Sequence, residues 1–471
     1  MVKSLQLGLW AGMLLLLVAP LAGAQDESTI DSGDTAWVLV ASALVMLMTP
    51  GLALFYGGMV RRKNVLATIV PVFMILGLVA IQWVLIGYTL AFGPDRGGVI
   101  GGLDFAFLRG VSADAPNPTY SATVPHQAFM VFQMMFAIIT PALILGAVAE
   151  RIRFSALAVF TVLWATLVYD PLAHWVWADG GWLRSLGALD FAGGLVVHFS
   201  SGVAALACAL FIGRRLGWGE RPMAPNNITL TLLGAGLLWF GWFGFNAGSA
   251  LAANGLAVKA FVNTQLGAGA AALGWAAMEL WRRGKPTGLG TASGLVAGLV
   301  AITPACGFVG PMASILIGLG AGVVCYLGCA LKELLRFDDA LDAWGIHGVG
   351  GAFGAVATGL FAAGVGFFAT ADGSLGWNPA GGRAFGVQLV GIAVTAAFSF
   401  LVTWGLLWGI DRTIGLRVPR EDEERGLDAA VHGEEGYATC DCPAHTPDKH
   451  PLPAATVSVG LMEVGGFVRH R

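Results

Sequence analysis

Charge is the property that this sequence has least of. Only 12% of its 471 residues are Asp, Glu, Lys or Arg, whereas soluble domains average about 25%. Hydrophobic residues make up 56% of the chain, and the mean hydropathy is +0.74. This composition excludes an ordinary soluble domain and is typical of an integral membrane protein with many spans. The formal net charge of −3 gives no basic surface, so no nucleic-acid binding is expected.

Cysteine is also scarce. The chain has six cysteines, and Cys208, Cys325 and Cys329 lie inside apolar runs, where a thiol acts as a small hydrophobic group. No spacing is typical of an extracellular disulfide framework. We expect no cofactor. A metal site built on two histidines of the apolar runs, His198 and His347, would need further carboxylate or thiolate ligands, and none is evident beside them.

Long apolar runs dominate the sequence instead. Eleven stretches have roughly the 20 residues needed to cross the hydrocarbon core, and we predict an all-α integral membrane protein with eleven transmembrane helices. The expected spans are residues 36–60, 64–92, 126–149, 154–177, 190–213, 227–250, 256–281, 287–304, 311–332, 343–366 and 384–411.

The first residues have the parts of a secretory signal peptide. A positive charge at Lys3 precedes an apolar run, and small residues at 21–24 form a cleavage site before Gln25. An uncleaved first helix is the alternative. The expected domains are a signal peptide (1–24), a membrane domain (25–417) and a cytoplasmic tail (418–471).

The loop charges predict the orientation of the spans. With the N-terminus outside, the cytoplasmic loops carry thirteen Lys and Arg and the outer loops five, as the positive-inside rule requires. The thirteen are Arg61, Arg62, Lys63, Arg151, Arg153, Arg214, Arg215, Arg221, Arg282, Arg283, Lys285, Lys332 and Arg336, and the five are Arg96, Arg109, Arg184, Lys259 and Arg383. We expect a multi-pass protein of the cytoplasmic (inner) membrane, with a periplasmic N-terminus and a cytoplasmic C-terminus.

Two histidines stand out because they lie in runs that are otherwise apolar and rich in glycine. A charge at the centre of a span costs about 2.5–3.5 kcal/mol on insertion scales, so His198 and His347 predict a function. The alternative for each is a core histidine bonded to a neighbouring carbonyl. Each follows an aspartate, Asp190 or Asp339, by eight residues.

This shared spacing belongs to a weak internal repeat. The segments FYGGMVRRKN (55–64) and FNAGSALAAN (245–254) also share Phe, Gly and Asn at the same offsets. Two five-span halves must be inverted, which places substrate sites near the midplane. Eight residues of helix rise about 12 Å, so His198 and His347 approach mid-depth from opposite sides of a core about 30 Å thick.

The chain resembles the ammonium transporters of the Amt/Mep/Rh family, in its bacterial Amt branch, over nearly all of residues 36–437. The Rh branch is the alternative, but Trp177 resembles the Amt pattern. The matching segments, in family order, are FQMMFAIITPALILGAVAERIRFSA (132–156), PLAHWVW (171–177), GALDFAGGLVVH (187–198), GWFGFNAGSA (241–250), GIHGVGG (345–351) and GLRVPREDEERGLDAAVHGEEGY (415–437).

The resemblance implies a homotrimer with one pore per subunit, which is a transporter of ammonium or ammonia (methylammonium as analogue) and not an enzyme. It assigns cation recruitment to Trp177, Phe132, Phe136 and Ser249, organised by Asp190. It makes Phe136 and Phe245 the gate and places Trp242, His198 and His347 in the pore. Aromatic faces attract cations, and imidazoles can take a proton from ammonium, which potassium does not carry. Whether net NH3 or NH4+ crosses stays open, and we favour net charge movement.

The charged segment 417–437 resembles the family tail that docks on the pore and meets a PII-type signal protein. A solvated tail is the alternative. A second function is an ammonium sensor that signals through this tail to a PII-type protein, although the tail is short for an attached enzymatic domain. Beyond residue 437, Cys440, Cys442, His445 and His450 depart from the family pattern, and a metal site there is less expected than disorder.

Overall fold

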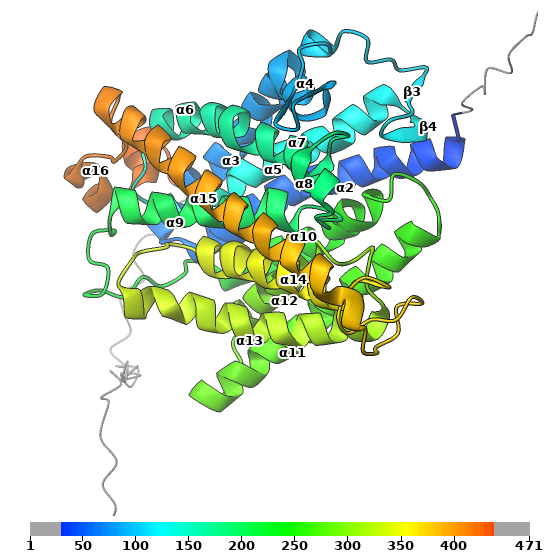
Figure 1. Cartoon of the computed structure of the whole chain (residues 1–471). Coiled ribbons are helices and arrows are strands. Elements are labelled where there is room, and N and C mark those ends of the chain that lie inside the picture. The colour runs from blue at the N-terminus through cyan, green and yellow to red at the C-terminus, as the bar shows by residue number, and fades with distance from the viewer. Residues whose placement is uncertain (1–29, 438–471) are drawn as a thin grey trace, which may run out of the picture. The chain divides into compact units, whose positions relative to one another are not determined.

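The computed structural model describes residues 30–437, and they form a bundle of long helices (Figure 1). The expected signal peptide (1–24) and the Cys/His segment after residue 437 lie outside the described residues. The prediction of eleven spans is confirmed. Eight of the described helical stretches are long and apolar enough to cross a membrane by themselves, and α12, with 15 residues, is a shorter apolar helix.

The first five spans are α2 (Ser32–Met59), α3 (Leu66–Gln82) continued by η2 (Trp83–Gly87) and α4 (Tyr88–Phe92), α5 (His126–Val148), α6 (Phe154–Trp164) continued by η4 (Ala165–Tyr169) and α7 (Asp170–Trp177), and η5 (Gly194–Phe199) continued by α9 (Ser200–Ile212). The other six are α10 (Ile228–Gly248), α11 (Gly255–Arg283), α12 (Gly288–Ile302), α13 (Pro311–Leu335), η6 (Trp344–Gly348) continued by α14 (Val349–Phe361), and α15 (Gly382–Thr413).

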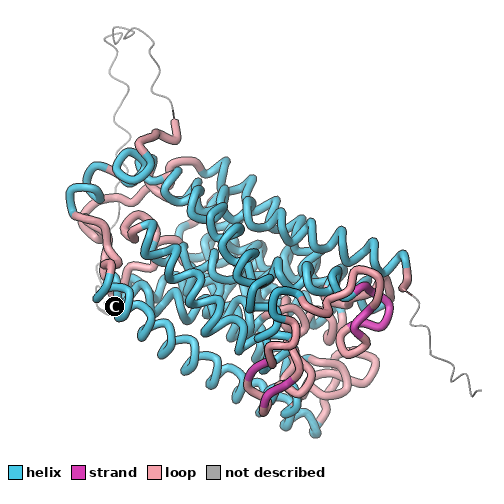
Figure 2. The backbone as a smooth tube through the Cα atoms, turned by 90° about the horizontal axis from the view of Figure 1, so that it is seen from above, coloured by secondary structure: helices cyan, strands magenta, loops and turns pink. Residues whose placement is uncertain are grey.

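Short elements lie at the two ends of the bundle. The strand pairs β1 (Asp95–Arg96) with β2 (Ile100–Gly101) and β3 (Pro116–Asn117) with β4 (Ser121–Pro125) are antiparallel and gather at one end (Figure 2). The tail helix α16 (Arg420–Arg425) lies at the other end (Figure 1). The remaining short elements are η1 (Arg62–Asn64), η3 (Ala106–Leu108), α8 (Trp182–Leu186), η7 (Pro379–Gly381) and η8 (Asp428–His432).

Several helices begin where a polar side chain binds their free N–H groups. Asp31 accepts from the N–H of Asp34 at the start of α2, Asn227 caps α10, and Thr287 caps α12. Such caps satisfy backbone donors that the helix itself leaves unpaired. Apolar side chains cover the rest of each helix, because the backbone of a span must satisfy its hydrogen bonds internally.

Matching helices of the two halves pack against each other. α2 contacts α10, and η5 contacts η6, at the centre of the bundle. The approach is very close at Gly202 on α9, where an added Cβ would lie 2.0 Å from the backbone N of Gly348. Glycine at such a position lets two helix backbones meet. This pairing of corresponding spans agrees with the predicted inverted five-helix repeat.

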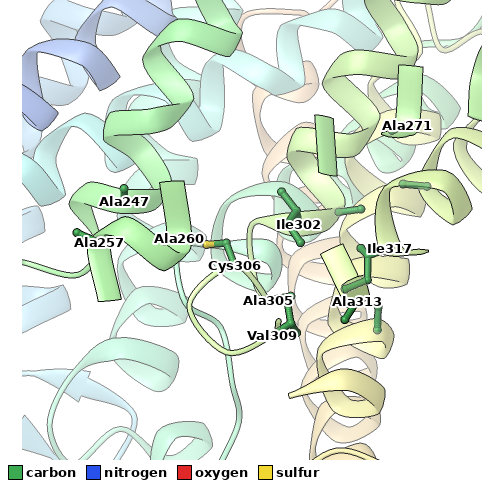
Figure 3. Packing of buried hydrophobic residues seen from close by; sticks show 13 residues of the cluster. Ala247, Ala257, Ala260, Ala271, Ile302, Ala305, Cys306, Val309, Ala313 and Ile317 are labelled. Atoms are coloured by element: carbon green, nitrogen blue, oxygen red, sulfur yellow. The ribbon is translucent and has the colours of Figure 1, made fainter. Parts of the chain in front are cut away.

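Small side chains let α10 to α14 pack tightly in the second half. Most members of one buried cluster are alanines, and they meet around Ile302 and Ile317 (Figure 3). Small residues are the usual means of close helix packing in membranes, where apolar burial alone does not drive association. The second half therefore packs closely around η6 and α14, the span that carries His347.

Candidate functional site

A cavity of about 220 Å³ opens at the end of the bundle that carries the strand pairs. Trp177, Phe136 and Ser249, all predicted for cation recruitment, line it together. The Ser249 hydroxyl donates to the Phe245 carbonyl at 2.8 Å, so its lone pairs are free to accept an N–H bond. The cavity thus combines aromatic faces with a hydrogen-bond acceptor.

Two predicted recruitment residues do not line this cavity. Phe132 is fully buried behind Phe136, with ring centroids 4.9 Å apart, and it supports the position of that ring. Asp190 turns its carboxylate toward the start of its own helix. The backbone carbonyl of Asp190, in contrast, accepts from the Trp177 indole N–H at 2.9 Å.

Two stacked rings close the floor of the cavity. Phe136 and Phe245 lie with their centroids 4.2 Å apart and their planes at 29°. Both are almost fully buried. The Trp177 ring meets Phe136 edge-on at 5.9 Å. An apolar double layer of this kind excludes a hydrated ion, because no group there replaces the lost water.

The two histidines meet directly behind this stack. The Nδ1 atoms of His198 and His347 are 3.3 Å apart, and both side chains are buried. One Nδ1 must donate and the other accept, so the rings hold different tautomers when both are neutral. The Nε2 atom of His198 has no partner among the described residues. The pair therefore has a nitrogen available to a small hydrogen-bonding substrate.

An indole fixes one face of the pair. Trp242 stacks on His198 with centroids 5.2 Å apart and planes at 21°. Its N–H donates to the Thr303 hydroxyl at 2.9 Å, and the single O–H of Thr303 lies 2.7 Å from the Leu299 carbonyl and 3.2 Å from Asn246 Oδ1. This buried chain of bonds locks the indole and so restricts the rotation of His198.

Local backbone geometry explains why both histidines point inward. The Asp190 carboxylate accepts from the N–H groups of four residues, 193 to 196, at 2.6–3.1 Å. Asp339 likewise accepts from Ala343 and Trp344 at 3.1 and 2.8 Å. Each aspartate therefore begins a π-helical turn, η5 or η6, that carries a histidine. Such turns are frequent at functional sites.

Sequence reasoning missed several residues of the site. Gln133, Tyr120 and Arg184 also line the outer cavity, and Thr303 holds the indole of the pore. Arg184 is the least expected, since a fixed cation opposes the binding of a cationic substrate. Its guanidinium donates to the Trp177 carbonyl. Two residues separate Arg184 from the GALDFAGG motif, and this position in the sequence could have indicated that it lies near the outer cavity.

The described residues contain no group of three or more His, Cys, Asp or Glu side chains that could hold a metal ion. The buried polar groups of the site instead bind backbone N–H groups or each other. The chemistry available there is therefore hydrogen bonding, cation–π contact and proton transfer.

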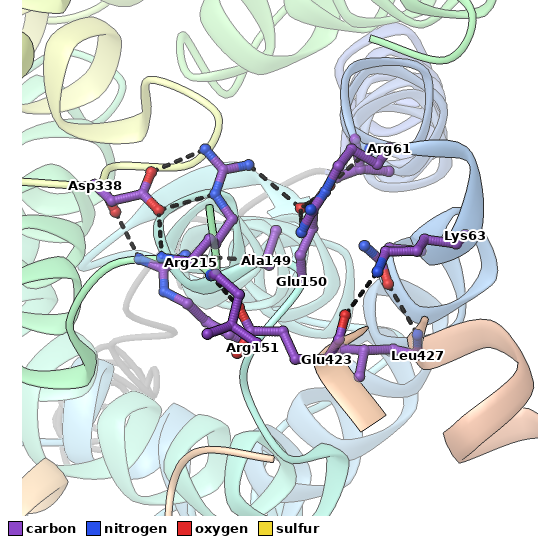
Figure 4. Close-up of polar contacts among 12 residues, drawn as sticks. Arg61, Lys63, Ala149, Glu150, Arg151, Arg215, Asp338, Glu423 and Leu427 are labelled. Atoms are coloured by element: carbon purple, nitrogen blue, oxygen red, sulfur yellow. Dashed lines mark hydrogen bonds and ion pairs between the residues drawn. The ribbon is translucent and has the colours of Figure 1, made fainter. Parts of the chain in front are cut away.

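An ionic cluster, drawn in Figure 4, lies beside the tail helix α16. Arg215 binds Asp338 through two nitrogens at 2.8–2.9 Å, and Glu150 accepts from Arg61. Burial raises the pKa of Asp338, but the bonds from Arg215 outweigh it, so the pKa stays below its usual range. Burial lowers the pKa of the Arg151 guanidinium to about 10.

The tail segment packs onto this cluster. Leu416, Val418 and Leu427 are buried, and Lys63 donates to the Glu423 carbonyl at 2.7 Å (Figure 4). The compact unit that contains the helices extends to Gly436.

Comparisons with known proteins agree with one another. A sequence model described as the Ammonium Transporter Family matches residues 36–437. An ammonium transporter of Bacillus subtilis is 51% identical over 412 residues, which covers 86% of this chain and 98% of the relative. Ammonium transporter Amt1 of Archaeoglobus fulgidus is 48% identical over 409 residues, with 87% and 100% covered.

Solved structures give the same result. The crystal structure of Saccharomyces cerevisiae Mep2 is similar with a TM-score of 0.76 and 39% identity, over 83% of this chain and 89% of that chain. A structure named Sensor Amt Protein has a TM-score of 0.77 and 29% identity, over 85% and 98% of the two chains.

Proposed function

The chain belongs to the Ammonium Transporter Family and is a multi-pass membrane transporter of ammonium, and from this premise we propose how it selects its substrate. The family consists of transporters and not of enzymes. Ammonium and potassium have similar size and charge, so a selective pore must use the protons of ammonium.

Recruitment takes place in the outer cavity. The faces of Trp177 and Phe136 attract the cation by about 0.5–2 kcal/mol, depending on desolvation. Ser249 accepts one N–H bond, and Phe132 holds Phe136 from behind. Asp190 contributes indirectly, because it orders the helix start and the carbonyl that binds the Trp177 indole. It does not touch the ion.

Deprotonation follows at the stacked gate of Phe136 and Phe245. The observation that carries this proposal is the 3.3 Å contact between His198 and His347 directly behind that gate. An N–H bond of ammonium breaks, its proton passes to an imidazole nitrogen, and neutral ammonia crosses the apolar lumen beside Trp242. Net charge then moves if the proton follows, which is the outcome that we favour.

The test is the current elicited by ammonium in proteoliposomes that contain the purified protein. We expect a current with ammonium and methylammonium and none of comparable size with potassium. Protein-free liposomes control for leakage. Potassium currents equal to those of ammonium would contradict the deprotonation mechanism, since potassium has no proton to release.

Orientation and assembly are also proposals. The ionic cluster and the basic loops lie at the end of the bundle that carries α16, which supports a cytoplasmic C-terminus in the inner membrane and a periplasmic N-terminus. We further propose a homotrimer embedded in membrane lipid with one pore per subunit. The docked segment 416–437 offers a surface for a PII-type signal protein.

A sensor function is the second candidate. The similarity to the structure named Sensor Amt Protein favours it, as does a tail that binds three cytoplasmic loops. A sensor would bind ammonium without sustained flux. Ammonium-dependent PII binding without any current in proteoliposomes would favour sensing, whereas sustained current favours transport.

A further inference from the structure

One buried acid has no role in the pathway described above. Asp170 begins α7 inside the fourth span, and its exposed fraction is 0%. Its Oδ2 atom accepts from the Gln82 amide at 2.8 Å, and the same amide donates to the Thr166 hydroxyl at 3.0 Å. Asp170 does not line the outer cavity. It lies between the second and fourth spans.

Three polar atoms around this acid have no partner among the described residues. They are Asp170 Oδ1, Gln82 Oε1 and the Tyr169 hydroxyl, and all are buried. A buried polar atom without a partner loses its hydrogen bonds to water and gains none in exchange, so each requires an explanation. A proton on Oδ1 and buried water molecules would supply these partners, since a buried water bonds to two to four polar neighbours.

Other buried acids of the described chain are stabilised differently. Asp190 and Asp339 bind backbone N–H groups, and so do Glu279 and Asp428. Glu150, Asp338 and Glu423 are paired with arginines. Asp170 has one neutral side-chain donor. An ionised carboxylate with so little support is costly inside a membrane, and such residues mark proton pathways.

Asp170 and the histidine pair both lie inward of the outer cavity. Trp177, at the end of α7, bonds to the Asp190 carbonyl just before η5. Asp170 lies seven helical residues inward from Trp177, which is about 10 Å. His198 lies on η5, inward from Asp190.

Asp170 shares α7 with a second buried titratable residue. His174 lies one turn outward on α7, about 6 Å away along the axis. It is fully buried, and its Nε2 lies 2.9 Å from the Asp95 carboxylate in the outer loop. Its Nδ1 lies 2.9 Å from the Ala91 carbonyl. A hydrogen-bonded pair of titratable groups, His174 and the solvated Asp95, therefore lies between Asp170 and the outer surface.

The backbone also departs from regular helix at this site. The π-helical turn η2 begins directly after Gln82, and η4 ends directly before Asp170. The two π-helical turns thus lie on neighbouring spans, on either side of the contact between Gln82 and Asp170. The central histidines are also carried by π-helical turns.

We propose that Asp170, with Gln82 and Tyr169, forms a proton-relay site beside the pore, reached from outside through Asp95 and His174. The inference rests on the proposed function, because a relay serves a transporter that moves net charge. In the relay, the Oδ1–H bond of Asp170 breaks and its proton passes to a buried water molecule, which becomes hydronium and releases a proton to the next water inward. The Asp170 carboxylate then takes up a proton from the outer side. This proton transfer involves no change of oxidation state and no further reactant.

Infrared spectroscopy tests the site independently of transport. In lipid-reconstituted protein at neutral pH, we expect a protonated-carboxyl band that shifts in D2O and is absent from Asp170→Asn. The matched control Asp114→Asn, which removes an exposed outer-loop carboxylate, should retain the band. A wild-type spectrum without a band that depends on Asp170 would overturn the proposal.

Ammonium-elicited current tests the relay. Asp170→Asn keeps an acceptor for Gln82 but carries no exchangeable acid proton, and we expect its current to fall by on the order of 10²-fold. Asp170→Glu should restore much of the current, and Asp114→Asn should equal wild type. Wild-type current in a folded Asp170→Asn variant would refute the relay. Absence of current in the wild type would instead refute the proposed function, and the infrared result would still decide whether Asp170 holds a proton.

Discussion

Removal of the Glu423 carboxylate should release the tail from the membrane domain. Glu423 is 2% exposed and accepts from the Leu216 N–H at 2.7 Å and from Arg417 at 2.8 and 3.2 Å. Breaking a fully buried pair costs about 3–5 kcal/mol. The Arg417 side chain is 30% exposed, however, and keeps other partners, so we expect about 2 kcal/mol for Glu423→Ala.

Such a loss corresponds to about a 30-fold rise in the population with the tail undocked. Hydrogen–deuterium exchange of residues 416–437 measures this population directly. Glu424→Ala is the matched control, because Glu424 is exposed and, within residues 30–437, its side chain is seen to pair with the exposed Arg420 alone. Its exchange should stay near the wild-type rate. Equal exchange in Glu423→Ala and Glu424→Ala would refute the assignment of docking energy to the buried carboxylate.

Transport provides the functional readout of the same prediction. Glu423→Ala should reduce ammonium current and weaken PII binding, and truncation after Gly415 should reduce the current further and abolish PII binding. Truncation after Tyr437 should leave both largely intact. Full activity in the shorter variant would contradict a coupling between tail and pore, and loss of activity only on removal of residues 438–471 would assign that role to the final segment.

Three further predictions concern the pore and its two ends. Replacement of either His198 or His347 should impair selective methylammonium uptake. The free-energy cost of the double replacement should be smaller than the sum of the two single costs. Unchanged uptake in both single leucine variants would show that the histidines are core residues. Arg184→Gln should tighten apparent ammonium affinity by about fivefold, with a smaller gain at high salt, because the fixed charge acts through partly screened solvent; an unchanged affinity at low salt would contradict this. The pKa of Asp338 is lower in the folded protein than the value of about 4 expected for an unfolded chain, so the pair with Arg215 stabilises the fold fully above pH 4 and loses this contribution as the pH falls through the folded-state pKa. Asp338→Asn should therefore reduce the fall in melting temperature at acid pH. An unaltered fall would contradict the assignment.

The spans and the meeting of the histidines were predictable from sequence because membrane physics acts on each helix separately. Lipid contact requires apolar side chains over a fixed length, so hydropathy locates the spans. The equal spacing of Asp190 from His198 and Asp339 from His347 then predicted a common depth, and the 3.3 Å contact agrees with it.

Other features depend on packing between helices, which sequence alone does not determine. Residues 83–87 and 165–169 have ordinary apolar sequences, and only their neighbours make them π-helical. Phe132 has the same aromatic character as Phe136, but the fold buries it behind the cavity wall. Apolar and polar residues alternate too little in residues 93–125 to predict the two strand pairs. Main-chain hydrogen bonds in this outer loop hold these pairs together.

The hydrogen bonds of the tail join it to the span that carries His198. Arg417 donates to the carbonyls of Ile212 and Arg214 at 3.1 and 2.7 Å, just where α9 ends, and Arg151 donates to Gly213 at 2.9 Å. The last carbonyls of a helix have no intrahelical donors, so these guanidiniums supply bonds that the helix end requires. The same span begins with the turn that carries His198. We therefore propose that a docked tail stabilises one end of the span whose other end carries His198, and that tail release changes the geometry of the histidine pair without any contact to the substrate.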